Sequence, residues 1–155
     1  MKPSALYSGL MAELLSELVD SPAKDDIPVG ALIVDQNLKI ISKAFNIRLK
    51  NNDPTGHAEI EVMRLAGSKL NTWRLDEYTM IVTLEPCLMC TGAILQARLK
   101  RVVFGAYEQK SGSLVSRPYL QVTSWPEIIP GVMEEECSSL IKNWFAEKRN
   151  NRYDG

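Results

Sequence analysis

Four side chains that can build a metal-dependent catalytic site lie in two short segments of this 155-residue chain. His57, the only histidine, precedes Glu59 in a His-Ala-Glu segment, and Cys87 and Cys90 follow in Pro-Cys-Leu-Met-Cys. One imidazole and two thiolates match the three protein ligands of a catalytic zinc ion, whose fourth position holds water. The carboxylate of Glu59 is then free to move protons. Together these residues predict a zinc centre that activates water.

The spacing of the four residues indicates how they meet. Cys87 and Cys90 are three residues apart, so the first turn of a helix would place both thiols on one face. A helix N-terminus also favours the thiolate, which is the form that binds metal. Glu59 stands two residues from His57 and points in another direction, so it can reach the bound water without becoming a ligand. We expect burial to raise the pKa of Glu59, as a two-way proton carrier requires.

The cysteine pair by itself also fits other sites. A Cys-x-x-Cys segment occurs in redox pairs, in half of a structural zinc site, and by chance. A structural zinc ion would need a fourth protein ligand, and the only remaining cysteine is Cys137. Cys137 falls on the apolar stripe of a predicted C-terminal helix, where a buried small side chain is expected. A redox pair would leave His57 and Glu59 unexplained, so the open catalytic zinc site is the favoured prediction.

The bulk composition is that of an ordinary globular protein, with 45% hydrophobic and 24% charged residues. The length suits one domain, which we expect to comprise residues 1–155. No apolar run is long enough to cross a membrane, and the chain does not start with a secretory signal, so we expect a cytoplasmic protein. Three cysteines, two of them close together, favour a metal or redox site in a reducing compartment over a disulfide framework.

The net charge of −1 gives no overall support for nucleic-acid binding. Two local groups of cations stand out against it. They are Lys142, Lys148, Arg149 and Arg152 near the C-terminus, and Arg98, Lys100 and Arg101 further upstream. On charge alone, we expect both groups to be solvated faces.

The apolar periodicity predicts helices that alternate with strands. Helices are predicted over residues 6–19, 54–70 with Thr55 as its cap, 86–98, and from about Met133; strands are predicted over 29–34, 39–45, 79–84 and 101–105. The first two strands form a hairpin, while the last two are joined through a helix and should be parallel. A layered α/β domain with a mixed sheet follows. It places His57 and both cysteines at helix N-termini, beside the carboxyl ends of strands.

Longer segments around these residues resemble a known enzyme family. They are Pro28-Val29-Gly30-Ala31, Asn52-Asp53-Pro54-Thr55, His57-Ala58-Glu59-Ile60, Val82-Thr83-Leu84-Glu85-Pro86-Cys87 and Arg101-Val102-Val103-Phe104-Gly105-Ala106. An H-x-E…P-C-x-x-C pattern is the known signature of zinc nucleobase deaminases. The chain resembles the cytidine/deoxycytidylate deaminase superfamily, and the flanking strings resemble its bacterial tRNA-specific adenosine deaminases. The resemblance covers about residues 27–113.

The resemblance implies a fold, an activity and a set of site residues. The implied fold is a three-layer α/β/α domain with a mixed, mostly five-stranded sheet. The implied activity is hydrolytic conversion of wobble adenosine to inosine in a tRNA anticodon stem-loop, by a homodimer with one Zn2+ per subunit. The implied roles are His57, Cys87 and Cys90 as ligands, Glu59 as proton shuttle, Asn46 as a partner of the base, the backbone around Leu84 and Glu85 as pocket wall, and Glu108 as a further substrate contact.

Other features of the chain leave alternatives open. Gly56 replaces the usual alanine before the ligand histidine, and we expect it to loosen the backbone there. Glu108 stands where aspartate is usual, and the following segment is shorter than in the family. A deaminase of a free base or nucleoside, of guanine, cytosine or cytidine type, and a non-catalytic zinc-stabilised RNA-binding module are therefore also considered. Asn46 also fits a loop-forming residue, and Trp144 with Phe145 fits a core position.

Overall fold

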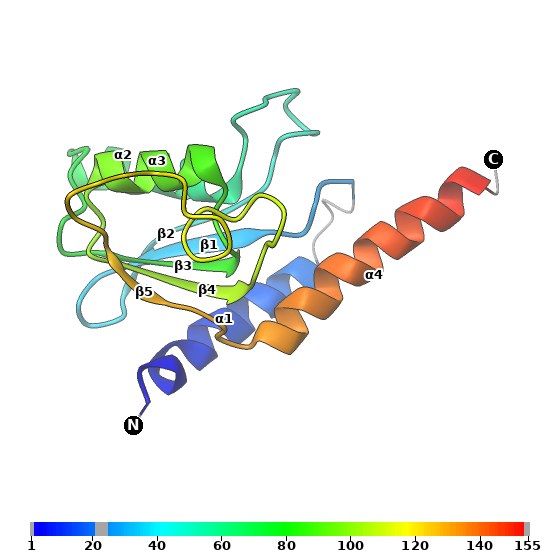
Figure 1. Ribbon diagram of the computed structural model, residues 1–155, viewed down its shortest axis with the longest axis horizontal. Coiled ribbons are helices and arrows are strands. Elements are labelled where there is room, and N and C mark those ends of the chain that lie inside the picture. Colours follow the sequence, from blue (N-terminus) through cyan, green and yellow to red (C-terminus); the bar gives the residue numbers. More distant parts are fainter. Residues whose placement is uncertain (1, 21–24, 154–155) are drawn as a thin grey trace.

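A five-stranded mixed sheet forms the middle layer of the molecule (Figure 1) in the computed structural model, which describes residues 2–20 and 25–153. The strands are β1 (Gly30–Val34), β2 (Ile40–Phe45), β3 (Thr79–Leu84), β4 (Arg101–Ala106) and β5 (Glu127–Ile129), in the order β2-β1-β3-β4-β5. β1 pairs antiparallel with β2 and β3, and β4 pairs parallel with β3 and β5. The predicted mixed sheet, with its hairpin and parallel pair, is confirmed.

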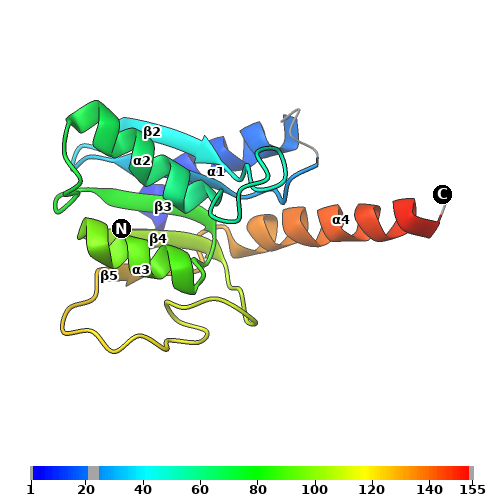
Figure 2. The same ribbon diagram turned by 90° about the horizontal axis from the view of Figure 1, so that it is seen from above.

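Two pairs of helices cover the two faces of the sheet (Figures 1 and 2). They are α1 (Pro3–Asp20) with α4 (Glu134–Tyr153) on one face, and α2 (Ala58–Leu70) with α3 (Leu88–Ala97) on the other. Every residue of β1 is buried, and so are the first five residues of β3. Both strands are covered on both faces, which explains why they read as continuous apolar runs. The predicted three-layer α/β/α architecture is confirmed.

The helices that carry the candidate ligands begin later than predicted. Thr55 is not a helix cap, because the Asp53 Oδ1 atom accepts hydrogen bonds from its backbone N and its hydroxyl, both at 2.8 Å. That turn delays α2 until Ala58, with an extended His57 as its N-cap. In the same way α3 starts at Leu88 after an extended Cys87, so Pro86 lies outside the helix. With these corrections His57 and Cys87 are themselves the helix N-caps, and Cys90 lies in the first turn of α3.

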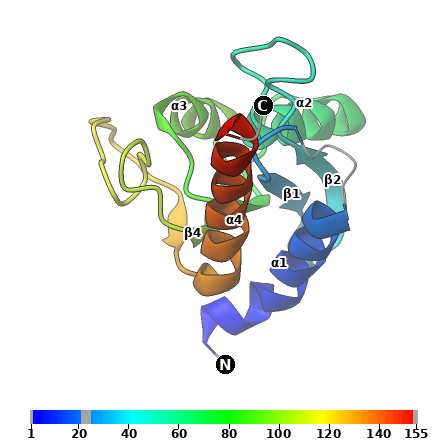
Figure 3. The same cartoon turned by 90° about the vertical axis from the view of Figure 1, so that its right-hand side faces the viewer.

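The last helix extends well past the sheet (Figures 1 and 2) and points towards the viewer in Figure 3. Cys137, near its start, is 1% exposed, as expected for a structural cysteine. Phe145, two turns further, is 42% exposed, so its predicted place in the core is wrong. Helix α4 has 20 residues and is longer than the layer it covers, so its second half has no sheet to pack against. Among the described residues, no helix combines the length and apolar character that a membrane crossing requires.

Candidate metal centre and active site

Three potential metal ligands converge where α2 and α3 begin. The Nδ1 atom of His57 lies 3.6 Å from the Sγ atom of Cys87 and 3.4 Å from that of Cys90. All three donor atoms lie within 4.8 Å of one another. His57 is the N-cap of α2, Cys87 is the N-cap of α3, and Cys90 occupies the first turn of α3. The predicted placement of the three residues at two helix N-termini is confirmed.

The spacing and chemistry of these donors fit a zinc ion. With Zn–S bonds of about 2.3 Å and Zn–N bonds of about 2.0 Å, tetrahedral geometry puts a nitrogen and a sulfur about 3.5 Å apart. The two observed N···S distances, 3.6 and 3.4 Å, bracket that value. Among the residues that the structure describes, no further side chain of histidine, cysteine or an acid joins these three ligands. A zinc ion held here would keep one position open to solvent or substrate.

The two thiols are electrostatically different in this arrangement. A hydrogen bond from the Cys90 thiol is the main cause that lowers the pKa of Cys87 to about 4, and His57 adds to the effect. The same hydrogen bond and burial raise the pKa of Cys90. The hydrogen bond to Cys87 also raises the pKa of His57. One thiolate is therefore already present at neutral pH, while the second must lose its proton to a metal.

Glu59 lies in the first turn of α2 and is only 5% exposed. Burial is the dominant cause that raises the pKa of its carboxyl group, whereas hydrogen bonding to Cys90 and the charge of His57 act in the opposite direction. The carboxyl group thus lies beside the ligand cluster without belonging to it. A buried carboxyl with a raised pKa holds a proton more readily than a free one, which suits a group that must both accept and donate a proton. The direction of the pKa shift agrees with the prediction from sequence.

Asn46 follows the last residue of β2 and is buried. Its backbone N donates to Val29 O at 3.0 Å, and its Oδ1 atom accepts from Arg48 N at 3.0 Å. The side-chain oxygen therefore shapes the loop, which is the alternative considered from sequence. Its amide nitrogen makes no hydrogen bond within the described parts of the chain, so this donor remains available to a ligand.

The side chain of Glu85 organises the loop that follows β4. Glu85 is 2% exposed, and its carboxylate accepts hydrogen bonds from the backbone N atoms of Glu108 (3.2 Å), Val115 (2.9 Å) and Ser116 (2.9 Å), and from the Ser116 hydroxyl. Gly112 passes so close that a Cβ atom there would lie 2.5 Å from Glu85 Oε1. The sequence indicated only a backbone role for Glu85, because the partners of its side chain lie more than twenty residues away.

The loop that follows β4 is held against the candidate metal ligands. Gly112 forms an isolated β-bridge with Cys87, and Ser113 N donates to Pro86 O at 2.9 Å. Glu108 is half-buried and its carboxylate accepts from Lys110 N at 3.0 Å. Leu84 closes β3 opposite Ala106. Leu84, Glu85 and Glu108 therefore surround the same end of the sheet as the four catalytic candidates.

A layered α/β domain with an open His-Cys-Cys cluster and an adjacent buried glutamate defines a zinc-dependent deaminase of the nucleobase class. Residues 6–106 match the model of the cytidine and deoxycytidylate deaminase zinc-binding region. The chain is 40% identical over 141 residues to a tRNA-specific adenosine deaminase of Haemophilus influenzae, an alignment that covers 88% of this chain and 82% of the relative. The chain belongs to the cytidine and deoxycytidylate deaminase family, in its tRNA-specific adenosine deaminase branch.

Two solved structures support the same placement. One, from a study of A-to-I editing by tRNA:A34 deaminases at the wobble position of transfer RNA, is 36% identical with a TM-score of 0.78. The alignment covers 85% of this chain and 99% of the chain in that structure. The other, a guanine deaminase from Bacillus subtilis, is 30% identical with a TM-score of 0.61 and covers 80% of this chain and 87% of its own. The tRNA-directed structure is the more similar of the two by both measures.

Proposed function

We propose that residues 1–155 form a single deaminase domain that converts wobble adenosine to inosine in a tRNA anticodon. The observation that carries this proposal is the 40% identity to a tRNA-specific adenosine deaminase across most of both chains. The zinc-compatible cluster supports the reaction type, which consumes one water and releases ammonia. As a tRNA-modifying enzyme the chain would act in the cytoplasm.

The proposed chemistry divides between the metal ligands and Glu59. His57, Cys87 and Cys90 would hold one Zn2+. When bound, this ion would act as a Lewis acid that lowers the pKa of water. Glu59 takes a proton from the attacking water and delivers it to a ring nitrogen of adenine. Glu59 then takes the proton of the new hydroxyl on the ring carbon and passes it to the departing amine, so that the carbonyl forms as the carbon–nitrogen bond breaks with loss of ammonia. Its buried, protonatable carboxyl is suited to both transfers.

The proposed base contacts come from the ends of β2 and β3. The free amide nitrogen of Asn46 can donate to an acceptor on the purine edge. The backbone at Leu84 and Glu85 would form a wall of the pocket, and Glu108 would lie at its edge. An anticodon loop suits such a site, because its bases are already unpaired and cost little to splay out.

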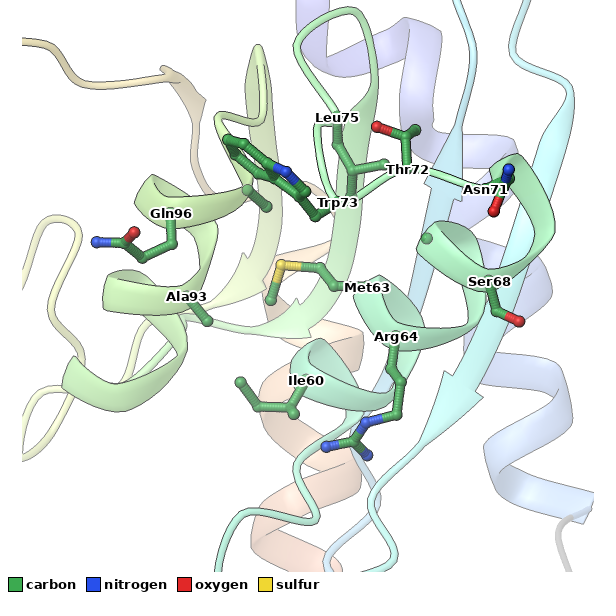
Figure 4. A pocket seen from close by; sticks show the side chains of 12 residues that line it. Ile60, Met63, Arg64, Ser68, Asn71, Thr72, Trp73, Leu75, Ala93 and Gln96 are labelled. Atoms are coloured by element: carbon green, nitrogen blue, oxygen red, sulfur yellow. The ribbon is translucent and has the colours of Figure 1, made fainter.

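The homodimer that we propose would use the groove between α2 and α3 (Figure 4). This groove has a volume of about 900 Å³. Apolar side chains from both helices and the following loop line it, among them Ile60, Met63, Trp73 and Ala93. Trp73 is 63% exposed and belongs to this apolar lining, and exposed apolar patches are typical of surfaces that bind another protein. A second copy of the chain would cover this surface.

The deciding experiment is an inosine assay with purified protein, tRNA anticodon stem-loops and free bases. Inosine formed at a wobble adenosine, with little ammonia from free guanine, cytosine or cytidine, is the expected result. Inert stem-loops together with rapid ammonia release from a free base would instead identify a small-molecule deaminase, as the guanine deaminase fold match allows. A protein that binds RNA and zinc but releases no ammonia would be a non-catalytic module.

A further inference from the structure

The loop between β2 and α2 carries exposed cations beside the metal cluster. It stands at the end of the molecule towards which α4 projects (Figures 1 and 2). Arg48 and Lys50 are both exposed on this loop. Neither side chain forms a salt bridge with any residue that the structure describes. Two unpaired cations are thus presented near the candidate active site.

A buried carboxylate fixes the shape of this loop. Asp26 is only 4% exposed, and its two oxygens accept hydrogen bonds from Leu49 N at 2.7 Å and Lys50 N at 3.0 Å. Both donors are backbone groups, so the bonds hold the main chain and leave the Lys50 amine free. Burial of a carboxylate is costly unless hydrogen bonds compensate it, so these two bonds couple the burial of Asp26 to the shape of the loop.

Gly56 brings the same loop close to the ligand histidine. A Cβ atom at residue 56 would lie 3.1 Å from the N and Cα atoms of Arg48 and from Asp53 O. Ile47 N also donates to Gly56 O at 2.9 Å, and Asp53 N donates to Arg48 O at 3.0 Å. The expectation that glycine loosens the backbone here is wrong, because the missing side chain permits closer packing. Arg48 is therefore held against the residue that precedes His57.

Helix α4 approaches the segment that anchors this loop. The neighbouring Asp25 pairs with Lys148 of α4 at 3.3 Å, so the projecting helix lies beside the segment that anchors the loop. Cations from the loop and from α4 therefore flank one end of the molecule.

We propose that Arg48 and Lys50 form a preformed contact for the phosphodiester backbone of the RNA next to the target nucleotide, with Asp26 as the positioning residue that sets their turn. This inference rests on the proposed function and deepens it. Guanidinium and ammonium groups bind phosphate through charge-assisted hydrogen bonds. A turn already held in shape loses less conformational entropy on binding than a mobile one.

The test measures binding of a fluorescent anticodon stem-loop that carries inosine at the wobble position, so that no turnover occurs. Loss of two phosphate contacts should make the slope of log affinity against log salt less negative by about 1.4, and weaken binding roughly tenfold at about 0.15 M salt. Arg48→Ala combined with Lys50→Ala is the variant. Lys39→Ala is the matched control, because Lys39 is exposed at the opposite end of the β1–β2 hairpin and should leave affinity unchanged.

A double-mutant cycle tests the role of Asp26. Asp26→Asn replaces one acceptor by an N–H2 group that faces a backbone N–H, so it should weaken RNA binding at least about threefold. In the Arg48→Ala/Lys50→Ala background the same substitution should have no further effect. A purely structural role would instead weaken both backgrounds equally. Thermal unfolding identifies a misfolded Asp26→Asn protein, in which case the cation variants still decide the proposal.

The outcomes separate this inference from the proposed function. Wild-type protein that forms inosine, with cation variants that bind RNA and respond to salt as the wild type does, would overturn the phosphate contact alone. Wild-type protein that neither forms inosine nor binds the stem-loop would overturn the proposed function and the contact with it. A weakened affinity that persists unchanged at high salt would also contradict a phosphate contact.

Discussion

At the scale of single residues, burial and hydrogen bonding assign different tasks to the acids near the metal cluster. Glu59 is buried and protonatable, whereas Glu85 is buried and engaged by four donors. Asp26 is buried and engaged by two backbone N–H groups. Of these three acids, Glu59 is the one whose raised pKa suits the proton transfers that we propose.

Glu59→Gln should abolish deamination while it preserves the metal site. Glutamine keeps the shape of the side chain but cannot carry a proton between water and base, so we expect turnover to fall by about 10²–10⁴-fold. Inosine formation and zinc per chain are the measurements. Glu61→Gln is the control, since this acid lies in the same helical turn and pairs with Arg64. Loss of zinc in Glu59→Gln would mean that the glutamate is a ligand.

The pH dependence of zinc binding should report the two different thiols. Cys87, with a pKa of about 4, is already a thiolate near neutral pH, whereas Cys90 keeps its proton because its pKa is raised. Zinc binding must then displace the proton of Cys90 and, where the raised pKa keeps His57 protonated, that of its imidazole too, so apparent affinity should rise at least about tenfold per pH unit between about pH 6 and 8 and most steeply towards pH 6. Competition with a chromogenic chelator measures this slope. A flat profile would show that both thiols are already deprotonated.

At the scale of elements, two helix caps and two loops assemble the candidate site. The caps of α2 and α3 supply two of the ligands and the first turn of α3 the third, and the β2–α2 loop and the segment after β4 form the surroundings of the site. Each loop is tied by a carboxylate that comes from another part of the chain: Asp26 for the first and Glu85 for the second. The shape of the site therefore depends on hydrogen bonds to carboxylates that lie outside the two loops.

Glu85→Ala should release the loop after β4. It leaves several backbone N–H groups without their acceptor, so the free energy of unfolding should fall by about 1–3 kcal/mol. Limited proteolysis should cut within residues 107–117, and denaturant unfolding should show the lost stability. Glu108→Ala removes a half-buried carboxylate of the same loop and should change stability by less than about 0.5 kcal/mol. Equal protease resistance in Glu85→Ala and wild type would contradict the anchoring role.

At the scale of the whole molecule, the two helical layers differ in what they leave uncovered. The α2/α3 layer presents the groove that contains Trp73, whereas the α1/α4 layer extends a helix past the sheet. The groove and the ligand cluster share α2 and α3. A partner bound in the groove would therefore contact the same two helices that carry the candidate metal ligands.

Trp73→Asp should convert a dimer into a monomer. A charge at this exposed position costs little in the isolated chain but would be buried without a partner in the proposed interface. Analytical ultracentrifugation measures the mass in solution. Leu65→Asp is the control, because Leu65 is 49% exposed on α2 but does not line the groove. A wild-type protein that sediments as a monomer would rule out this interface.

Local patterns in the sequence were enough to predict most of the fold and the metal cluster. Helical and strand periods depend on neighbouring residues, so β3 is predicted at its observed bounds and β4 to within a residue. The sequence pattern predicts no particular segment for β5, because three residues carry too little periodicity. The ligand residues are recognisable from sequence because the residues of each short motif, His-Ala-Glu and Cys-x-x-Cys, lie within four positions of one another. The helix starts predicted before His57 and Cys87 are both too early. For α2 the reason is that the Asp53–Thr55 turn competes with the helix start.

The sequence by itself determined which atoms can bind the metal and which carboxyl can move a proton, because residue type sets that chemistry. Only the tertiary structure decided that Asp26 and Glu85 hold loops, and that Gly56 packs tightly against Arg48. Such contacts join residues distant in the chain, and no local pattern encodes them. The exposure of Phe145 was decided in the same way, by how far the sheet extends beneath α4.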